Sequence, residues 1–240
     1  MVKIANHLIP AIFESRENRF VGNFLLEGEI HKCHILNPGR MIKFLVPGAK
    51  ILVEDRRSPK RKIPFSLIYV VHPNSLILID SIAPNKIVFE ALQNKEISEF
   101  KNIKLIQSEK IYGINRHSRI DFLLDNRIYI EVKATNYVEK NVGYFPDAPS
   151  LRAQKHVKEL IDLIEKNPNF EAYIFFIAQR TDINEIRPFD KIDHEFGKIL
   201  RKGENMGIKL RGFQINFQKN GYNAVLGKEI PINLVKRSNI

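Results

Sequence analysis

The segment RIDFLLDNRIYIEVKAT (residues 119–135) places two acids and a lysine inside what otherwise reads as two apolar strands. Every second residue from Ile120 to Leu124 is apolar, as is every second residue from Ile128 to Val132. Side chains alternate between the two faces of a strand, so each run presents one apolar face. Burial of both faces against one core places Asp121 on the same side as Glu131 and Lys133.

A three-residue connection over residues 125–127 preserves this pattern. It pairs Leu124 with Ile128, and the same register sets Asp121 opposite Glu131. Two carboxylates so placed repel each other unless a group neutralises them, and a divalent cation is the natural candidate. Carboxylate oxygens with open water positions are what Mg²⁺ prefers. Lys133 would lie beside the metal and could orient a water or stabilise charge on a phosphate.

The spacing alone also fits a structural alternative. In that alternative Lys133 pairs with both carboxylates in a surface salt-bridge ladder, and nothing is catalysed.

The composition is that of a soluble globular protein, with 240 residues of which 44% are hydrophobic and 27% charged. No apolar run is long enough to span a bilayer, and the N-terminal residues lack the pattern of a signal peptide. A single cysteine, Cys33, excludes an internal disulfide and a multi-cysteine zinc site. We therefore expect a cytoplasmic protein without a membrane partner. The net charge of +11 favours a polyanionic partner.

The chain divides near residue 82. Residues 1–82 show short apolar segments separated by turn residues such as Asn37-Pro38-Gly39, which predicts a small β-barrel or sandwich. This part carries 12 Lys and Arg against 7 Asp and Glu, and five of its cations lie within residues 56–62. That cluster fits either a solvated loop or a phosphate-contacting loop.

Residues 83–240 show a different order, namely helix, three strands, helix, strand, helix and hairpin, which predicts a mixed α/β domain. The first two helices are expected over residues 83–94 and 151–167, and the last over 194–207. Asn220-Gly221 predicts the turn of the C-terminal hairpin, which could pack back on the barrel.

Several segments together resemble the sugar fermentation stimulation protein A family. They are RENRF, NPGRM, SPKRKIPF, PNKIVFEAL, SRIDFLL, YIEVKATN and GYFPDAPSLRAQKHVKEL. The resemblance covers nearly the whole chain. It implies an N-terminal OB-like barrel joined to a PD-(D/E)xK nuclease-type domain, that is, an α+β protein with a mixed sheet flanked by helices, associated with DNA.

The resemblance also implies roles for individual residues. Asp121 matches the aspartate of the motif, and Glu131 and Lys133 match its ExK; Ile120 replaces the proline that names the superfamily. Glu90, on the preceding helix, lies where that superfamily often places another acid near the metal. The implied cofactor is Mg²⁺ or Mn²⁺.

Further candidates come from the distribution of charge and aromatic rings. Glu109 could face the metal or solvent, and Asp147 could cap a turn or lie near the site. Phe13, Phe20, Phe44 and Phe65 could stack bases, although a small barrel needs most of its phenylalanines for its core. The predicted phosphate contacts are Arg16, Arg19, Arg40, Arg56, Lys60, Arg61, Lys62, Arg152, Lys155 and His156.

Two functions remain in competition. In the first, the protein binds DNA and hydrolyses phosphodiester bonds with Mg²⁺ bound by Asp121 and Glu131, Lys133 positioning the attacking water. In the second, the same fold binds DNA without cleavage, as a regulator of sugar metabolism genes. RNA as a partner and a homodimer are left open by the sequence.

Overall fold

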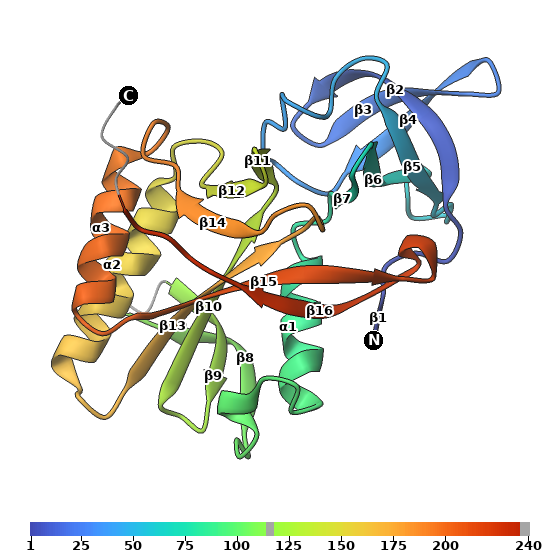
Figure 1. The fold of residues 1–240 in the computed structure, drawn as a ribbon. Helices are drawn as coiled ribbons and strands as arrows, with labels where there is room; N and C mark the ends of the chain where they lie inside the picture. The colour runs from blue at the N-terminus through green and yellow to red at the C-terminus, as the bar shows by residue number, and fades with distance from the viewer. Residues whose placement is uncertain (114–117, 236–240) are drawn as a thin grey trace.

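The computed structural model describes residues 1–113 and 118–235. A β-barrel is followed by a large mixed sheet with helices on both faces (Figure 1). Within the described residues, no helix is long and apolar enough to cross a membrane.

The barrel lies at one end of the molecule and confirms the expected OB-type fold. Its sheet has the order β4-β3-β2-β5-β6-β7, and a parallel pairing of β4 with β6 closes it. Phe13, Phe24, Ile51 and Leu67 fill its core. The second half of β2 is polar over residues 14–18, so periodicity alone does not indicate this strand. The strands are β2 (Ile9–Asn18), β3 (Val21–Leu26), β4 (Glu29–Ile35), β5 (Lys50–Asp55), β6 (Phe65–His72) and β7 (Ser75–Leu78).

The second part is built on a seven-stranded sheet of order β1-β16-β15-β13-β10-β9-β8. Its central strands β10, β13 and β15 are parallel, and the remaining neighbours are antiparallel. The strands are β1 (Val2–Lys3), β8 (Ile106–Tyr112), β9 (Ser118–Leu124), β10 (Ile128–Thr135), β13 (Glu171–Ala178), β15 (Lys209–Gln218) and β16 (Asn223–Ile230).

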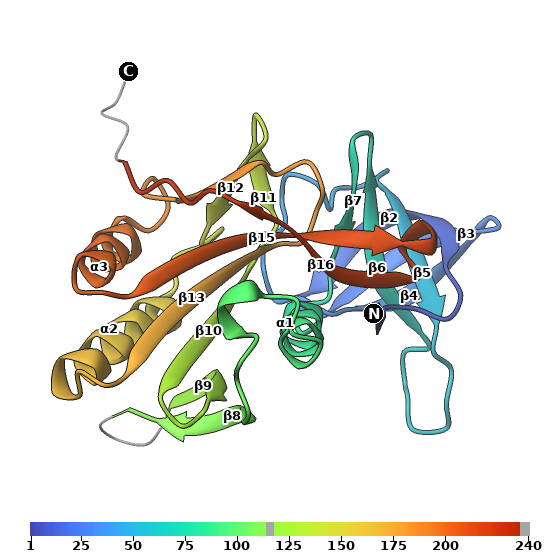
Figure 2. The same cartoon turned by 60° about the horizontal axis from the view of Figure 1, so that its bottom comes forward.

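Helices cover the two faces of this sheet (Figure 2). Helix α1 (Ala83–Gln93) packs its apolar stripe on one face, together with Phe175 and Ile177 of β13. Helices α2 (Leu151–Lys166) and α3 (His194–Asn205) lie side by side on the other face, against Ile174 and Phe176. These three helices match the predicted ones to within two residues at each end. A small sheet of β11 (Tyr137–Glu139), β12 (Val142–Phe145) and β14 (Glu185–Pro188) was not expected from the sequence.

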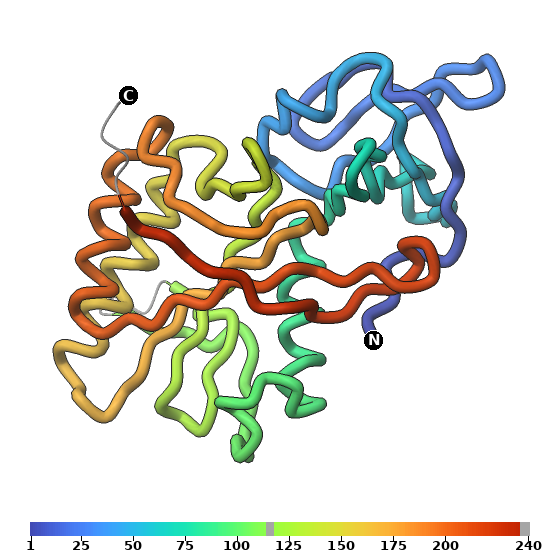
Figure 3. Tube along the Cα trace, viewed as in Figure 1, coloured from blue at the N-terminus to red at the C-terminus, as the bar shows by residue number. Residues whose placement is uncertain are grey.

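The barrel and the large sheet share one core. Ile68, Tyr69 and Leu78 of the barrel pack in the same cluster as α1 and the central strands. The Tyr69 hydroxyl donates to the carbonyl of Gly221, at the tip of the C-terminal hairpin, at 2.6 Å. Strand β1 precedes the barrel in sequence yet pairs with β16, so the N-terminal segment runs beside the hairpin (Figure 3).

Candidate active site

Strands β9 and β10 form the hairpin that carries the candidate acids. Leu124 pairs with Ile128 and Phe122 with Ile130, which confirms the predicted three-residue connection. Asp125 and Asn126 adopt positive φ angles of 46° and 55°. Asn and Asp tolerate this left-handed region better than most residues, which makes them suitable for the turn.

Asp121 is held by hydrogen bonds on both carboxylate oxygens. Its Oδ2 accepts from the backbone N–H of Val132 at 2.6 Å, and its Oδ1 accepts from Nδ2 of Asn85 on α1 at 2.6 Å. The β9–β10 ladder ends at Phe122, so Asp121 bonds to the backbone of β10 where a ladder pair with Glu131 was expected. Beyond the end of the ladder, Ile120 packs in the core beneath α2. The predicted single apolar face of β9 is therefore wrong at this residue, and so is the shared side predicted from it, because Asp121 contacts α1 whereas Glu131 contacts α2.

Glu131 is almost fully buried, with 3% of its surface exposed. Its Oε1 accepts from Nζ of Lys133 at 2.5 Å and from Nδ1 of His156 at 2.5 Å. A carboxylate only accepts, so His156 is the donor in the second bond. Its Oε2 is buried and has no partner among the described residues. One carboxylate oxygen is thus fixed by two donors while the other is left to bind something else.

The pKa values of the two acids are shifted in opposite directions. The pKa of Asp121 is raised to about 6, first by burial and then by the negative charge of Glu131, against the opposing hydrogen bond from Val132. Burial also favours a higher pKa for Glu131, but the charge of Lys133 and the hydrogen bond from His156 outweigh it and hold that pKa below its ordinary value. At neutral pH both groups are therefore largely ionised and repel each other.

The donor set fits a hydrated hard cation. No three His, Cys, Asp or Glu side chains within residues 1–113 and 118–235 converge as a metal site. Two carboxylates with most positions left to water are the arrangement that Mg²⁺ commonly adopts. The buried free Oε2 of Glu131 supplies the unused oxygen that such an ion needs. Lys133 pairs with Glu131 as in the salt-bridge alternative, but that alternative leaves Oε2 without a partner.

The other predicted acids lie apart from this arrangement. Glu90 binds the N-terminal ammonium of Met1, and the contact from α1 to Asp121 comes instead from Asn85. Asn85 and Glu90 are five residues apart in sequence, which separates their side chains by about 140° around the helix axis. The two side chains therefore leave α1 on different sides. Glu109 is exposed on β8.

Helix α2 contributes one buried residue to the site. His156 is 5% exposed, whereas Arg152 and Lys155 are exposed on the outer side of the helix. The three residues therefore do not form one phosphate-contacting surface as predicted, because His156 turns inward to Glu131. Asp193 fixes the start of the helix by accepting from the Ser150 backbone N–H and from Gln154 Nε2, both at 2.8 Å.

The predicted phosphate contacts of the barrel fall into two groups. All five N–H groups of Arg16 donate to backbone carbonyls of residues 18, 19, 37, 39 and 40, which leaves none for a phosphate. Arg56 pairs with buried Glu54, and Arg61 donates to Ser66 at 3.0 Å. Those three arginines are already paired within the barrel and form the first group. The second group is exposed at the surface and consists of Arg19, Arg40, Lys60 and Lys62.

One of the four candidate stacking rings is exposed. Phe13, Phe44 and Phe65 are at most 9% exposed and belong to the barrel core, whereas Phe20 is 47% exposed. The ring centroid of Phe20 lies 6.4 Å from that of His34. Phe20 is also adjacent in sequence to Arg19, so an exposed ring and a cation occur together.

Asp147 lies at the junction of the two parts. A Cβ atom on Gly39 would lie 3.1 Å from Oδ2 of Asp147, so the loop after β4 closely approaches the loop before α2. Burial raises the pKa of Asp147. The prediction that Asp147 serves the site stays a prediction.

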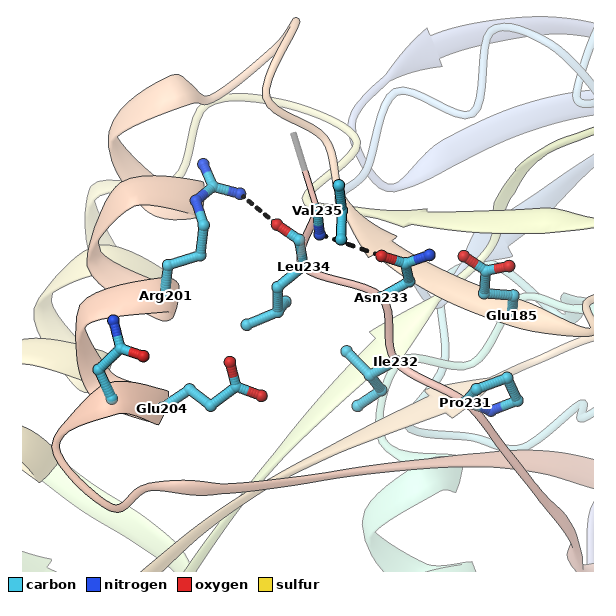
Figure 4. Close-up of a pocket in the computed structure, with 9 residues that line it drawn as sticks. Glu185, Arg201, Glu204, Pro231, Ile232, Asn233, Leu234 and Val235 are labelled. Atoms are coloured by element: carbon cyan, nitrogen blue, oxygen red, sulfur yellow. Dashed lines mark hydrogen bonds between the residues drawn. The ribbon is translucent and has the colours of Figure 1, made fainter. Parts of the chain in front are cut away.

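A surface pocket of about 600 Å³ lies elsewhere, between α3 and the segment after β16 (Figure 4). The guanidinium of Arg201 donates a hydrogen bond across this pocket to the carbonyl oxygen of Leu234, at 3.3 Å. The pocket contains none of the predicted site residues.

Comparison with known proteins identifies both parts of the chain. A family model described as "SfsA N-terminal OB domain" matches residues 15–79, and one described as "Sugar fermentation stimulation protein RE domain" matches residues 82–221. The chain belongs to the sugar fermentation stimulation protein (SfsA) family. The resemblance seen in the sequence is therefore confirmed.

Related SfsA proteins span nearly the whole chain. A sugar fermentation stimulation protein homolog of Clostridium acetobutylicum is 36% identical over 89% of this chain and 92% of its own length. That of Geotalea daltonii is 37% identical over 86% of this chain and 90% of its own. Among solved structures, "The structure of Pyrococcus Furiosus SfsA in complex with Ca2+" matches with a TM-score of 0.85 and 25% identity. The match covers 97% of this chain and 100% of that one.

Two residues that hold the candidate acids, Asn85 and His156, carry no clear signal of that role in the sequence. Asn85 reads only as part of a helix start after Pro84, and His156 reads as one of three basic residues on a helix surface. The spacing of His156 from buried Val157 and Leu160 was the available signal, since a residue adjacent to an apolar stripe often borders the core.

Proposed function

We propose that this SfsA protein binds DNA through its barrel and hydrolyses phosphodiester bonds with Mg²⁺ at Asp121 and Glu131. The observation that carries the proposal is the buried, unpartnered Oε2 of Glu131 beside the ionised Asp121. The Ca²⁺ complex of the Pyrococcus furiosus protein supports it, because that protein has the same fold and binds a hard divalent cation.

The residues around the two acids would have separate roles in this reaction. When bound, Mg²⁺ would supply an activated water and neutralise charge on the phosphate. Asn85 and the Val132 N–H orient Asp121, and His156 orients Glu131. Lys133 has three donors, of which Glu131 takes one. Its remaining N–H groups can orient a water or stabilise negative charge that develops on a phosphate.

Binding of the substrate would rest on charge outside the site. Arg19, Arg40, Lys60 and Lys62 of the barrel are exposed, and each cation that neutralises a phosphate releases counterions and makes the affinity depend on salt. The same observation favours the second candidate, in which the protein binds DNA without cleaving it.

The deciding experiment measures metal binding and cleavage on the same samples. Wild type, Asp121→Asn and Lys133→Ala would be titrated with Mg²⁺ and Mn²⁺ by calorimetry, then assayed on end-labelled single- and double-stranded DNA. We expect Asp121→Asn to lose both activities, and Lys133→Ala to keep metal binding while losing cleavage. Salt-sensitive DNA binding by a wild-type protein that binds no metal would refute hydrolysis and leave the DNA-binding alternative.

A further inference from the structure

Three buried oxygen atoms near α2 lack hydrogen-bond partners among the described residues. They are the hydroxyl of Tyr112, Oε2 of Glu131 and Oε2 of Glu159. Tyr112 is only 5% exposed. Buried polar atoms are nearly always hydrogen-bonded in native proteins, so three such atoms in one region indicate a shared ligand.

The three atoms belong to one cluster of side chains. Glu159 lies one turn after His156 on α2, and its Oε1 is 3.6 Å from Nζ of Lys155. A Cβ atom on Gly113 would lie 3.2 Å from the same oxygen, so Glu159 rests against the end of β8 next to Tyr112. The pKa of Tyr112 is raised by burial and then by the charges of Glu131, Glu159 and Asp121. Tyr112 also packs in one core cluster with Ile120, which precedes Asp121, and with Val157, which follows His156 on α2.

The hydrogen-bonding capacities of the three groups complement those of one water molecule. A tyrosine hydroxyl donates, whereas the two ionised carboxylate oxygens only accept. A water can accept from Tyr112 and donate one hydrogen to each carboxylate, which gives it the three bonds typical of a buried water. The remaining lone pair of the water and the second lone pair of Glu131 Oε2 are then both free to face a cation.

We propose that Tyr112 and Glu159 hold a water of the hydration shell of the cation at Asp121 and Glu131. This inference rests on the proposed function, and it makes the two side chains positioning residues of the site. They would fix one of the waters that fill the coordination positions left open by the two carboxylates. Groups that orient the surroundings of a metal commonly change its affinity by 10- to 100-fold when removed.

The test compares Tyr112→Phe, Glu159→Gln and the double variant of the full chain, titrated with Mn²⁺ by calorimetry. We expect each single variant to bind Mn²⁺ about 10-fold more weakly, and the double variant to bind little more weakly than the worse single one, because both act on one water. Tyr129→Phe is the matched control, since its ring packs 6.0 Å from that of Tyr112 on the same face. Glu165→Gln, exposed on α2, controls for the charge change.

Thermal unfolding separates this role from a structural one. Without metal, Tyr112→Phe should melt at or above the wild-type temperature, because it removes a buried hydroxyl without a partner. With Mn²⁺, its rise in melting temperature should be smaller than that of the wild type. Unchanged Mn²⁺ affinity in both single variants, or additive losses in the double variant, would overturn this inference alone. Absence of Mn²⁺ binding by the wild type would overturn the proposed function with it.

Discussion

Replacement of Asp121 by Asn should stabilise the metal-free protein at neutral pH. The pKa of Asp121 lies at about 6 in the folded chain, against about 3.9 in an unfolded one. Between these values the folded state holds a proton that the unfolded state has lost, so the contribution of Asp121 to stability falls as the pH rises and is constant above about pH 7. At roughly 1.4 kcal/mol per pKa unit, the ionised carboxylate costs about 3 kcal/mol.

The amide of Asn keeps one of the two hydrogen bonds of Asp121, and losing the other costs about 1 kcal/mol. The variant should therefore be more stable than the wild type by about 2 kcal/mol at pH 7.5 and no more stable at pH 4. Urea unfolding followed by circular dichroism measures this, because the chain contains no tryptophan. Asp162→Asn on α2 is the control and should reproduce the wild-type pH dependence.

Added Mg²⁺ supplies the complementary arm of the experiment. At pH 7.5, Mg²⁺ at about 10 times its dissociation constant should raise the free energy of unfolding of the wild type by about 1.4 kcal/mol. It should not change the free energy of unfolding of Asp121→Asn. A variant less stable than the wild type at pH 7.5 without metal would refute the electrostatic reasoning. It would show that the two hydrogen bonds of Asp121 outweigh its burial and its repulsion from Glu131.

The remaining predictions concern His156 and the barrel. His156→Ala should weaken Mn²⁺ binding in calorimetry about 10-fold, while His156→Asn, which keeps a donor near Nδ1, should restore most of it; equal losses would contradict the orienting role. Arg19→Ala and Arg40→Ala should each lower the salt slope of DNA binding by about 1 in a titration across salt concentrations, whereas Arg16→Ala should lower the melting temperature and leave the slope unchanged. Phe20→Ala should weaken single-stranded DNA binding by about 1–3 kcal/mol; equal affinity in fluorescence anisotropy would exclude stacking by this ring.

Much of the fold is readable from periodicity. The helices α1–α3 and the register of the β9–β10 hairpin follow from apolar spacing and a three-residue turn. Strand β2 does not, because its second half is polar and only its pairing with β3 and β5 makes it a strand. The sheet of β11, β12 and β14 is equally invisible, since its strands are three or four residues long.

Features of the candidate site that depend on local strand geometry follow from the sequence. Those that depend on tertiary contacts do not. The pleat places Glu131 and Lys133 on one face, and the structure agrees. No sequence pattern indicates that α1 presents Asn85 to Asp121 while Glu90 turns to Met1, because both depend on how the helix is rotated against the sheet. The sequence likewise suggests that Arg16 is a surface cation. In the structure its guanidinium donates to backbone carbonyls of the loop of residues 37–40.

The pairing of β1 with β16 has a consequence for the order in which the chain can fold. The barrel is enclosed in sequence between one edge strand of the large sheet and the rest of that sheet. A growing chain can form the barrel early, but β1 has no partner until the C-terminal hairpin has been synthesised. Contacts of such large sequence separation form slowly. Val2 and Lys3 should therefore be among the last described residues to gain protection from hydrogen exchange during refolding.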